Sequence, residues 1–164
     1  MNRKLVLSGV ILLQVFVQLG MAQTVELKFT LVEGPSHKPL GKINAITQDP
    51  HGYMWFAGNG ESCVYRYDGN RITTFRHDEA NSNSMGIDNP QTVYADTQGI
   101  IWIGGNGLDA YNPASGIFKN YRHDENDSGS LDGIVNTILK DHQDRLWVGT
   151  GRGLNLINKK TGKF

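Results

Sequence analysis

A tryptophan-centred segment occurs three times in this chain of 164 residues, and the repetition constrains the possible folds strongly. In each copy an Asp precedes the Trp by six residues, and successive Trp residues lie 47 and then 45 positions apart. Self-similarity at such a period indicates a repeat architecture, in which each copy is one structural unit. The copies are Asp49-Pro-His-Gly52-Tyr-Met-Trp55-Phe-Ala-Gly58, Asp96-Thr-Gln-Gly99-Ile-Ile-Trp102-Ile-Gly104-Gly105 and Asp141-His-Gln-Asp-Arg-Leu-Trp147-Val-Gly149.

Short runs of β-branched and aromatic residues surround each copy, separated by turns rich in Gly, Asn and Asp. A period in the mid-forties built from such runs is typical of a β-propeller blade, a small sheet of four strands. One blade has two apolar faces that it cannot bury alone, and stacking blades covers both. The sequence therefore predicts an all-β fold, a partial propeller of three consecutive four-stranded blades with one Trp at each joint.

The predicted organisation has a lead-in before the repeats. Val25 to Leu31 alternates apolar and polar residues, which predicts one strand, followed by a loop. Residues 43 to 48 are predicted as a strand with both faces buried. The predicted segments are a lead-in at 23–42, blades at 43–77, 92–122 and 135–164, and connections at 78–91 and 123–134.

The end of the third repeat indicates an incomplete blade. Phe164 aligns with Phe75 and Phe118, so the chain is predicted to end inside a fourth strand. Propellers close with about four to eight blades, and we therefore expect these residues to be a fragment of a longer gene product.

Each repeat also assigns structural roles. The Asp is expected to cap the turn before the Trp strand, at Asp49, Asp96 and Asp141. The glycine two positions after the Trp, at Gly104 and Gly149, is expected to allow a tight turn and close packing. Because Trp102 would have a neighbour on each side, its loss is expected to cost more than loss of Trp55.

The N-terminus has the pattern of a signal peptide. Basic Arg3 and Lys4 precede an apolar run from Leu5 to Leu19, and Gly20-Met21-Ala22 supplies small residues for cleavage. Residues 1–22 are therefore predicted to be a signal peptide, and the chain is expected in the periplasm. An uncleaved membrane anchor is the alternative, although the run is short for a span of about 20 residues.

Composition excludes some functions. Sixteen basic side chains balance sixteen acidic ones, so no field that attracts nucleic acid is indicated. Cys63 is the single cysteine, which excludes an intrachain disulfide, and its strand-like surroundings predict a buried thiol. An exported chain of this kind must be stabilised by packing.

At the pattern Asp-x-x-Gly-x-x-Trp-[Val/Ile]-Gly-Thr-x-x-Gly-Leu, the sequence resembles the two-component regulator propeller repeat. Residues 141–154 fit best, with Asp144 in place of the first glycine. The second copy has Gly105 where Thr is usual, and the first has Cys63-Val64 where Gly-Leu is expected. The resemblance covers residues 43–164. It implies the periplasmic sensor region of a hybrid two-component histidine kinase, with an oligosaccharide as ligand and with further blades and a membrane-linked kinase as partners.

Recognition is predicted at one end of the blades. In an up-and-down meander, the turns between second and third strands emerge at the same end as the connections between blades. Loops on a rigid scaffold commonly carry binding residues, although simple solvation of these polar side chains is the alternative. The candidate ligand-binding residues are Asn59, Glu61, His77, Asp78, Asn106, His123, Asp124 and Arg152.

The sequence predicts no catalytic residue, metal site or cofactor. The His-Asp-Glu triplets at 77–79 and 123–125 recur in phase with the repeat, and Asp124 to Gly129 matches only the first half of a calcium loop, because Val135 stands where a bidentate Glu is required. Gly104 to Gly107 precedes a strand rather than a helix, so it is not a phosphate loop. A secreted propeller lyase or glycosidase and a non-catalytic interaction propeller remain as alternatives, and a homodimer is also compatible.

Overall fold

A computed structural model describes residues 26–164 except 59 and 159–160. Eleven strands form three antiparallel sheets in which each strand pairs with its neighbour in sequence. The first sheet is β1 (Ile43–Gln48), β2 (Met54–Gly58), β3 (Cys63–Tyr67) and β4 (Ile72–Arg76). The second is β5 (Thr92–Ala95), β6 (Ile101–Gly105), β7 (Gly107–Asn112) and β8 (Ile117–Tyr121). The third is β9 (Val135–Lys140), β10 (Leu146–Thr150) and β11 (Gly153–Ile157).

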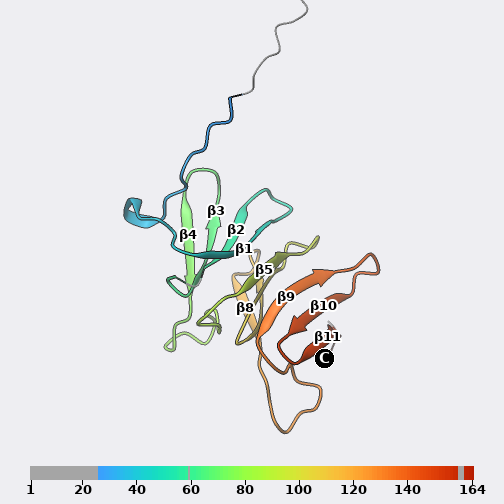
Figure 1. Ribbon diagram of the computed structural model, residues 1–164. Helices are drawn as coiled ribbons and strands as arrows, with labels where there is room; N and C mark the ends of the chain where they lie inside the picture. Colours follow the sequence, from blue (N-terminus) through green and yellow to red (C-terminus); the bar gives the residue numbers. More distant parts are fainter. Residues whose placement is uncertain (1–25, 59, 159–160) are drawn as a thin grey trace, which may run out of the picture. The chain divides into compact units, whose positions relative to one another are not determined.

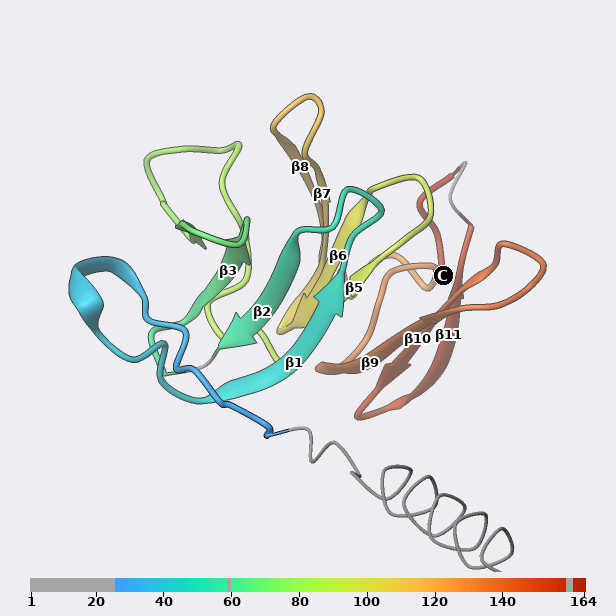
Figure 2. The ribbon, with the colours of Figure 1, turned by 90° about the horizontal axis from the view of Figure 1, so that it is seen from above.

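Three sheets, one for each repeat, confirm the predicted all-β fold. Sheet β5–β8 lies between the other two, and the first strands approach one another, β1 against β5 and β5 against β9 (Figures 1 and 2). The third sheet has three strands, extended by a single bridge between Asn158 and Lys163. One short 3-10 turn, η1 (Pro35–His37), precedes β1.

Two expectations about the first 48 residues differ from the structure. Residues 26–32 have no strand, and 26–31 are exposed; their alternation finds no partner strand among the described residues. β1 is an edge strand rather than a strand buried on both faces, and the side chain of Ile46 is 60% exposed. The predicted signal peptide lies outside the described residues. No helix within the described part of the chain has the length and apolar character needed to span a membrane.

The turns before the Trp strands explain why each strand pair forms. The N–H of Gly52 donates to the carbonyl of Asp49 at 2.9 Å, and Gly52 has a φ of +89°. Gly99 repeats this geometry, while Asp144 takes the left-handed conformation in the third copy with a φ of 63°. Asp is among the residues that tolerate this conformation, so the departure from glycine at 144 leaves the turn intact.

Two hydrophobic clusters join the sheets. The first contains Trp55 and Val64 of one sheet with Ile101 and Ile103 of the next. The second contains Trp102 and Leu108 together with side chains of β9, β10 and β11. A third cluster covers the other face of the first sheet and includes Cys63. The buried thiol was predicted, and burial raises its pKa.

Aromatic residues of the fourth strands follow a register that the sequence alignment missed. Phe75 pairs with Val64, and the residue at the same position in the second sheet is Tyr121, which pairs with Leu108. Phe118 pairs instead with Tyr111. In the third sheet Asn158 pairs with Lys163 as Asn112 pairs with Ile117, so Phe164 is equivalent to Phe118 but not to Phe75. The contacts agree: Phe75 meets Phe118 edge-on with centroids 6.3 Å apart, and Tyr121 meets Phe164 in the same way at 5.9 Å.

Candidate functional site

Each repeat has a polar contact between the turn Asp and the indole of the Trp, buried in the first two repeats and partly buried in the third. The indole Nε1 donates to Oδ2 of the Asp at 2.8 Å for Trp55 and Asp49, 3.1 Å for Trp102 and Asp96, and 2.8 Å for Trp147 and Asp141. Oδ1 of Asp49 accepts from the backbone N–H groups two and four residues later, and the other two Asp residues do the same. The carboxylate therefore caps the turn, as predicted, and also orients the indole. The constant spacing of six residues was the signal for this second role.

Asp141 carries an additional contact, from Nε of Arg145 to Oδ2 at 2.6 Å. The hydrogen bond from Trp147, aided by the donors from Arg145 and Gln143, lowers the pKa of Asp141 well below its usual range. The charged form of this carboxylate is thus the form that the folded chain stabilises.

The three indoles differ in how they are covered. Trp55 and Trp102 each pack against the sheet that follows, so both are buried between sheets. Trp55 stacks on Phe75 with centroids 5.4 Å apart, and Trp102 stacks on Tyr121 at 6.3 Å. Trp147 is half-buried. The greater cost expected for losing Trp102 than for losing Trp55 stays a prediction; in burial these two indoles are alike, and the one that differs is Trp147.

Gly104 lies within β6, where a Cβ atom would approach Cγ1 of Val135 to 2.4 Å. This glycine allows close packing of the second and third sheets, as predicted, although it lies within a strand rather than in a turn. At Gly149 a Cβ would approach Cγ2 of Thr137, in its own sheet, to 2.6 Å. The first repeat has buried Ala57 at this position, so the requirement for glycine depends on the neighbour.

The candidate loop residues occupy the predicted end of the sheets, but many stabilise turns. Oδ1 of Asp78 accepts from the N–H of Ala80, and Oδ1 of Asp124 accepts from that of Asn126. In both connections a Ser hydroxyl, of Ser84 or Ser130, bonds the N–H and the carbonyl of that Asp. The two connections thus share one internal geometry, which explains their recurrence without a ligand.

Other candidates at this end are held by local pairs. His77 bonds through Nδ1 to the carbonyl of Met85 at 2.8 Å, and Glu61 pairs with Arg76 at 2.5 Å. Asp132 draws two candidates together, because His123 lies 4.0 Å and Arg152 3.5 Å from its Oδ1. Asn106 is exposed, and Asn59 lies outside the described residues.

A buried ion pair was not predicted. Asp109 in β7 is fully buried and pairs with Nη2 of Arg122 at 2.8 Å, while its Oδ2 accepts from the N–H of Gly86 at 2.7 Å. Burial raises the pKa of Asp109, although the Arg122 charge opposes this. A Cβ at Gly86 would lie 2.0 Å from Nη2 of Arg122, so a larger residue here would displace the guanidinium. The positions equivalent to Asp109 hold Tyr65 and Asn155, so the repeat gave no signal for it.

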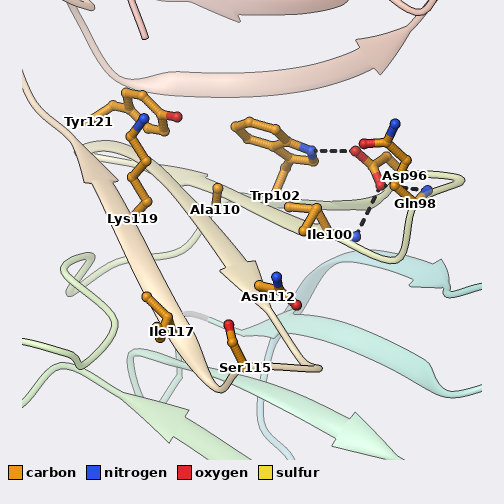
Figure 3. Close-up of a pocket in the computed structure, with 10 residues that line it drawn as sticks. All are labelled: Asp96, Gln98, Ile100, Trp102, Ala110, Asn112, Ser115, Ile117, Lys119 and Tyr121. Carbon is orange, nitrogen blue, oxygen red and sulfur yellow. Dashed lines mark hydrogen bonds between the residues drawn. The ribbon is translucent and has the colours of Figure 1, made fainter. Parts of the chain in front are cut away.

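A pocket of about 320 Å³ opens beside Trp102 on the second sheet (Figure 3). Trp102 and Tyr121 form its aromatic side, and Ala110 lies between them on β7. Asn112, Ser115, Gln98 and Lys119 contribute polar groups to its edge. The repeat pattern does not predict this pocket, which has the small residue Ala110 in its lining. Among the described residues, no three His, Cys, Asp or Glu side chains are arranged to hold a metal ion.

Comparison with known proteins places this geometry in a family. The sequence model of the family named Two component regulator propeller matches residues 38–60 and 129–152. A comparison with curated proteins found no match. Among solved structures, the extracellular domain assigned to a hybrid two-component system of B. thetaiotaomicron is 32% identical, with a TM-score of 0.72. That match covers 84% of this chain and 19% of the other, so the chain spans about a fifth of that domain.

Two further matches show the fold alone. The extracellular domain of a second B. thetaiotaomicron hybrid system is 20% identical with a TM-score of 0.61, covering 80% of this chain and 17% of that one. A catalytically inactive variant of virginiamycin B lyase from Staphylococcus aureus is 18% identical with a TM-score of 0.50, covering 72% and 38%. The family match on two repeats, the first structural match and the three sheets with their Asp–Trp contacts together support a two-component regulator propeller protein.

Proposed function

We propose that this chain is a ligand-sensing segment of an extracytoplasmic two-component sensor. The observation that carries the proposal is the 32% identity, over 84% of the chain, to the extracellular domain of a hybrid two-component system. The N-terminal pattern of basic, apolar and small residues supports export to the periplasm. In this proposal, further blades and a membrane-linked kinase are the partners, and this segment has no catalytic role of its own.

The ligand in this proposal is an oligosaccharide. The loop end of the sheets offers Asn106 and Arg152, which are exposed, and propeller loops on a rigid scaffold are suited to recognition. Asp78 and Asp124 contribute less in this proposal, since their carboxylates already accept backbone hydrogen bonds. Binding would bias the geometry of the sensor and so reach the kinase.

Thermal unfolding with soluble oligosaccharides of glucose, xylose, mannose and galacturonic acid tests this function. A ligand that binds only the folded chain stabilises it by about 2.7 kcal/mol at a concentration of 100 times Kd, so the melting temperature should rise with one of these sugars. Arg152→Glu should reduce the rise, whereas Arg71→Glu, in the exposed β3–β4 turn at the opposite end, should not.

Three outcomes would contradict parts of the proposal. Absence of any shift with every sugar would remove oligosaccharide sensing by this segment. If incubation yields shortened or unsaturated oligosaccharides, the result would indicate the alternative function, a secreted lyase or glycosidase. Equal binding by wild type, Arg152→Glu and Arg71→Glu would exclude the loop end as the recognition surface.

A further inference from the structure

We propose that residues 26–31 form the fourth strand of a further sheet, and that this sheet packs on the first sheet over Ile46 and Phe56. The inference rests on the proposed function, which takes further blades as partners, and it assigns one strand of such a blade to the lead-in of this chain. Two features carry it: an apolar segment that alternates like a strand, and a sheet face that lacks a neighbour.

The segment 26–31 has the pattern of a strand but no partner strand among the described residues. Leu27, Phe29 and Leu31 alternate with charged or hydroxyl-bearing residues, which is the period of two that a strand requires. The three apolar side chains are 76%, 91% and 69% exposed. Because burying such a row of side chains is favourable, pairing of this segment with a sheet would stabilise the protein.

The first sheet is open at a position that is closed in the other two. In each sheet, the residue of the first strand that pairs with the Trp is preceded by an apolar residue. This residue is 5% exposed as Val93 and 7% exposed as Ile138, and both pack in the joint with the preceding sheet. Its equivalent Ile46 is 60% exposed, and Phe56, which pairs with Ile46, is only partly buried. The first sheet therefore has the surface of a joint without the preceding sheet.

The segment 32–42 enters the first sheet as the connections enter the second and third sheets. The connections lead from a fourth strand to the next first strand over residues 77–91 and 122–134. Each places an apolar side chain on the sheet that it enters, Met85 in the first connection and Leu131 in the second. Leu40 does the same for the first sheet, where it is buried with Tyr65 and Phe56 packs against it.

A backbone contact supports the same equivalence. Tyr65 and Asp109 occupy one register position in the third strands of their sheets. The hydroxyl of Tyr65 donates to the carbonyl of Leu40 at 3.3 Å, and Asp109 accepts from the N–H of Gly86 at 2.7 Å. In both sheets this position fixes the segment that enters the sheet. Since a fourth strand precedes each connection, residues 26–31 stand in the place of a fourth strand.

The partner that fits is a three-stranded antiparallel sheet of the same repeat. The edge of such a sheet has a row of unpaired N–H and C=O groups, with which a further strand can pair. In the first two sheets, the fourth strand stacks an aromatic ring on the Trp of its own sheet, Phe75 on Trp55 at 5.4 Å and Tyr121 on Trp102 at 6.3 Å between centroids. Phe29 supplies the corresponding ring to the partner sheet.

Hydrogen exchange in the extracytoplasmic region of the full-length sensor tests the assignment. We expect the backbone amides of residues 26–31 to be protected there at least about a hundredfold, because amides paired in a sheet exchange only when it opens. In the chain of 164 residues, the same amides should exchange at the rate of an unstructured peptide. The amides of β6 are the control and should be protected in both proteins.

Variants on the two surfaces give an independent readout. Phe29→Asp and Ile46→Asp should lower the urea midpoint of the full region, because each would bury an unpaired charge in the joint. Neither should change the midpoint of the 164-residue chain, where both side chains are exposed. Val93→Asp, at the position equivalent to Ile46, should lower the midpoint of both proteins. Lys38→Asp, at an exposed residue of the same lead-in, should lower neither.

The outcomes separate this inference from the proposed function. Free exchange of residues 26–31 in a folded full region would overturn the inference, while a rise in melting temperature with a sugar would leave the proposed function standing. Protection that appears only as the protein concentration rises would also overturn it, because a second copy would then supply the sheet. Protection without any response to the sugars would overturn the oligosaccharide proposal alone.

Discussion

At the scale of single residues, the charge of Asp141 is part of the stability of the third sheet. Its folded pKa is depressed, chiefly by the Trp147 hydrogen bond. An unfolded Asp has a pKa of about 3.9. The contribution of the charged Asp141 carboxylate to the free energy of unfolding is therefore fully present above that pH, and it is lost as the pH falls toward the folded pKa. We expect the urea midpoint of the wild type to fall below about pH 4, and that of Asp141→Asn to fall less.

Asp88→Asn is the matched control, because Asp88 is an exposed carboxylate in a connection. The urea midpoint of Asp88→Asn should fall with decreasing pH as much as that of the wild type. Midpoints measured from pH 2.5 to 6 by far-UV circular dichroism check the prediction, which is wrong if the two variants respond alike.

The indoles allow a second prediction at this scale. Trp55→Ala and Trp102→Ala remove side chains buried between two sheets, and such truncations cost about 3–5 kcal/mol. Trp147→Ala should cost clearly less, because its indole is only half-buried. Chemical denaturation of the three variants tests this order, and equal losses at all three positions would contradict it.

At the scale of elements, the sequence predicted the turns and strands within each sheet better than the contacts between strands and between sheets. A six-residue spacing between Asp and Trp was sufficient to place the turn and the second strand, since both depend on local hydrogen bonds. The fourth strand was misaligned because the hairpin before it differs in length: Tyr67 pairs with Ile72, whereas Tyr111, at the equivalent position, pairs with Phe118. The pocket at Ala110 depends on contacts between strands, which spacing along the chain does not reveal.

The link between the β4–β5 connection and the second sheet leads to a third prediction. Arg122→Met leaves the carboxylate of Asp109 buried beside the N–H of Gly86 without its cation. Removing one partner of a buried pair costs roughly 3–5 kcal/mol, and we expect the lower end because Arg122 is partly exposed. Asp109→Asn should cost less, because its amide oxygen still accepts from Gly86 and water can reach Arg122.

The pH dependence separates the two variants. Burial raises the folded pKa of Asp109 above its unfolded value, so the cost of its charge appears as the pH rises through the folded pKa. Without the positive charge of Arg122, the free-energy cost of burying the charged carboxylate of Asp109 is larger. The loss of unfolding free energy caused by Arg122→Met should therefore shrink as the pH is lowered from 7 to 5, while the loss caused by Asp109→Asn should show no such change. Guanidinium unfolding at both pH values checks this, and a pH-independent loss in Arg122→Met would contradict it.

At the scale of the whole molecule, one register position shows which face of the third sheet is uncovered. Val64 and Leu108 occupy this position in the first two sheets and are fully buried at the joints. Leu154 occupies it in the third, pairs with Gly149, and is 69% exposed. Leu139, at 61%, lies on β9 of the same sheet, and both line a pocket of about 390 Å³ with Trp147.

A face of this kind promotes association, and a homodimer is one result. We expect the isolated chain to associate as its concentration rises, and Leu154→Asp to reduce association with little change in the free energy of unfolding. Leu108→Asp, the matched variant at a covered joint, should prevent folding, because it buries an unpaired charge. Sedimentation velocity together with urea unfolding measures both effects. A monomeric wild type at all concentrations, or a Leu154→Asp variant that unfolds as readily as Leu108→Asp, would show that this face is not an open joint.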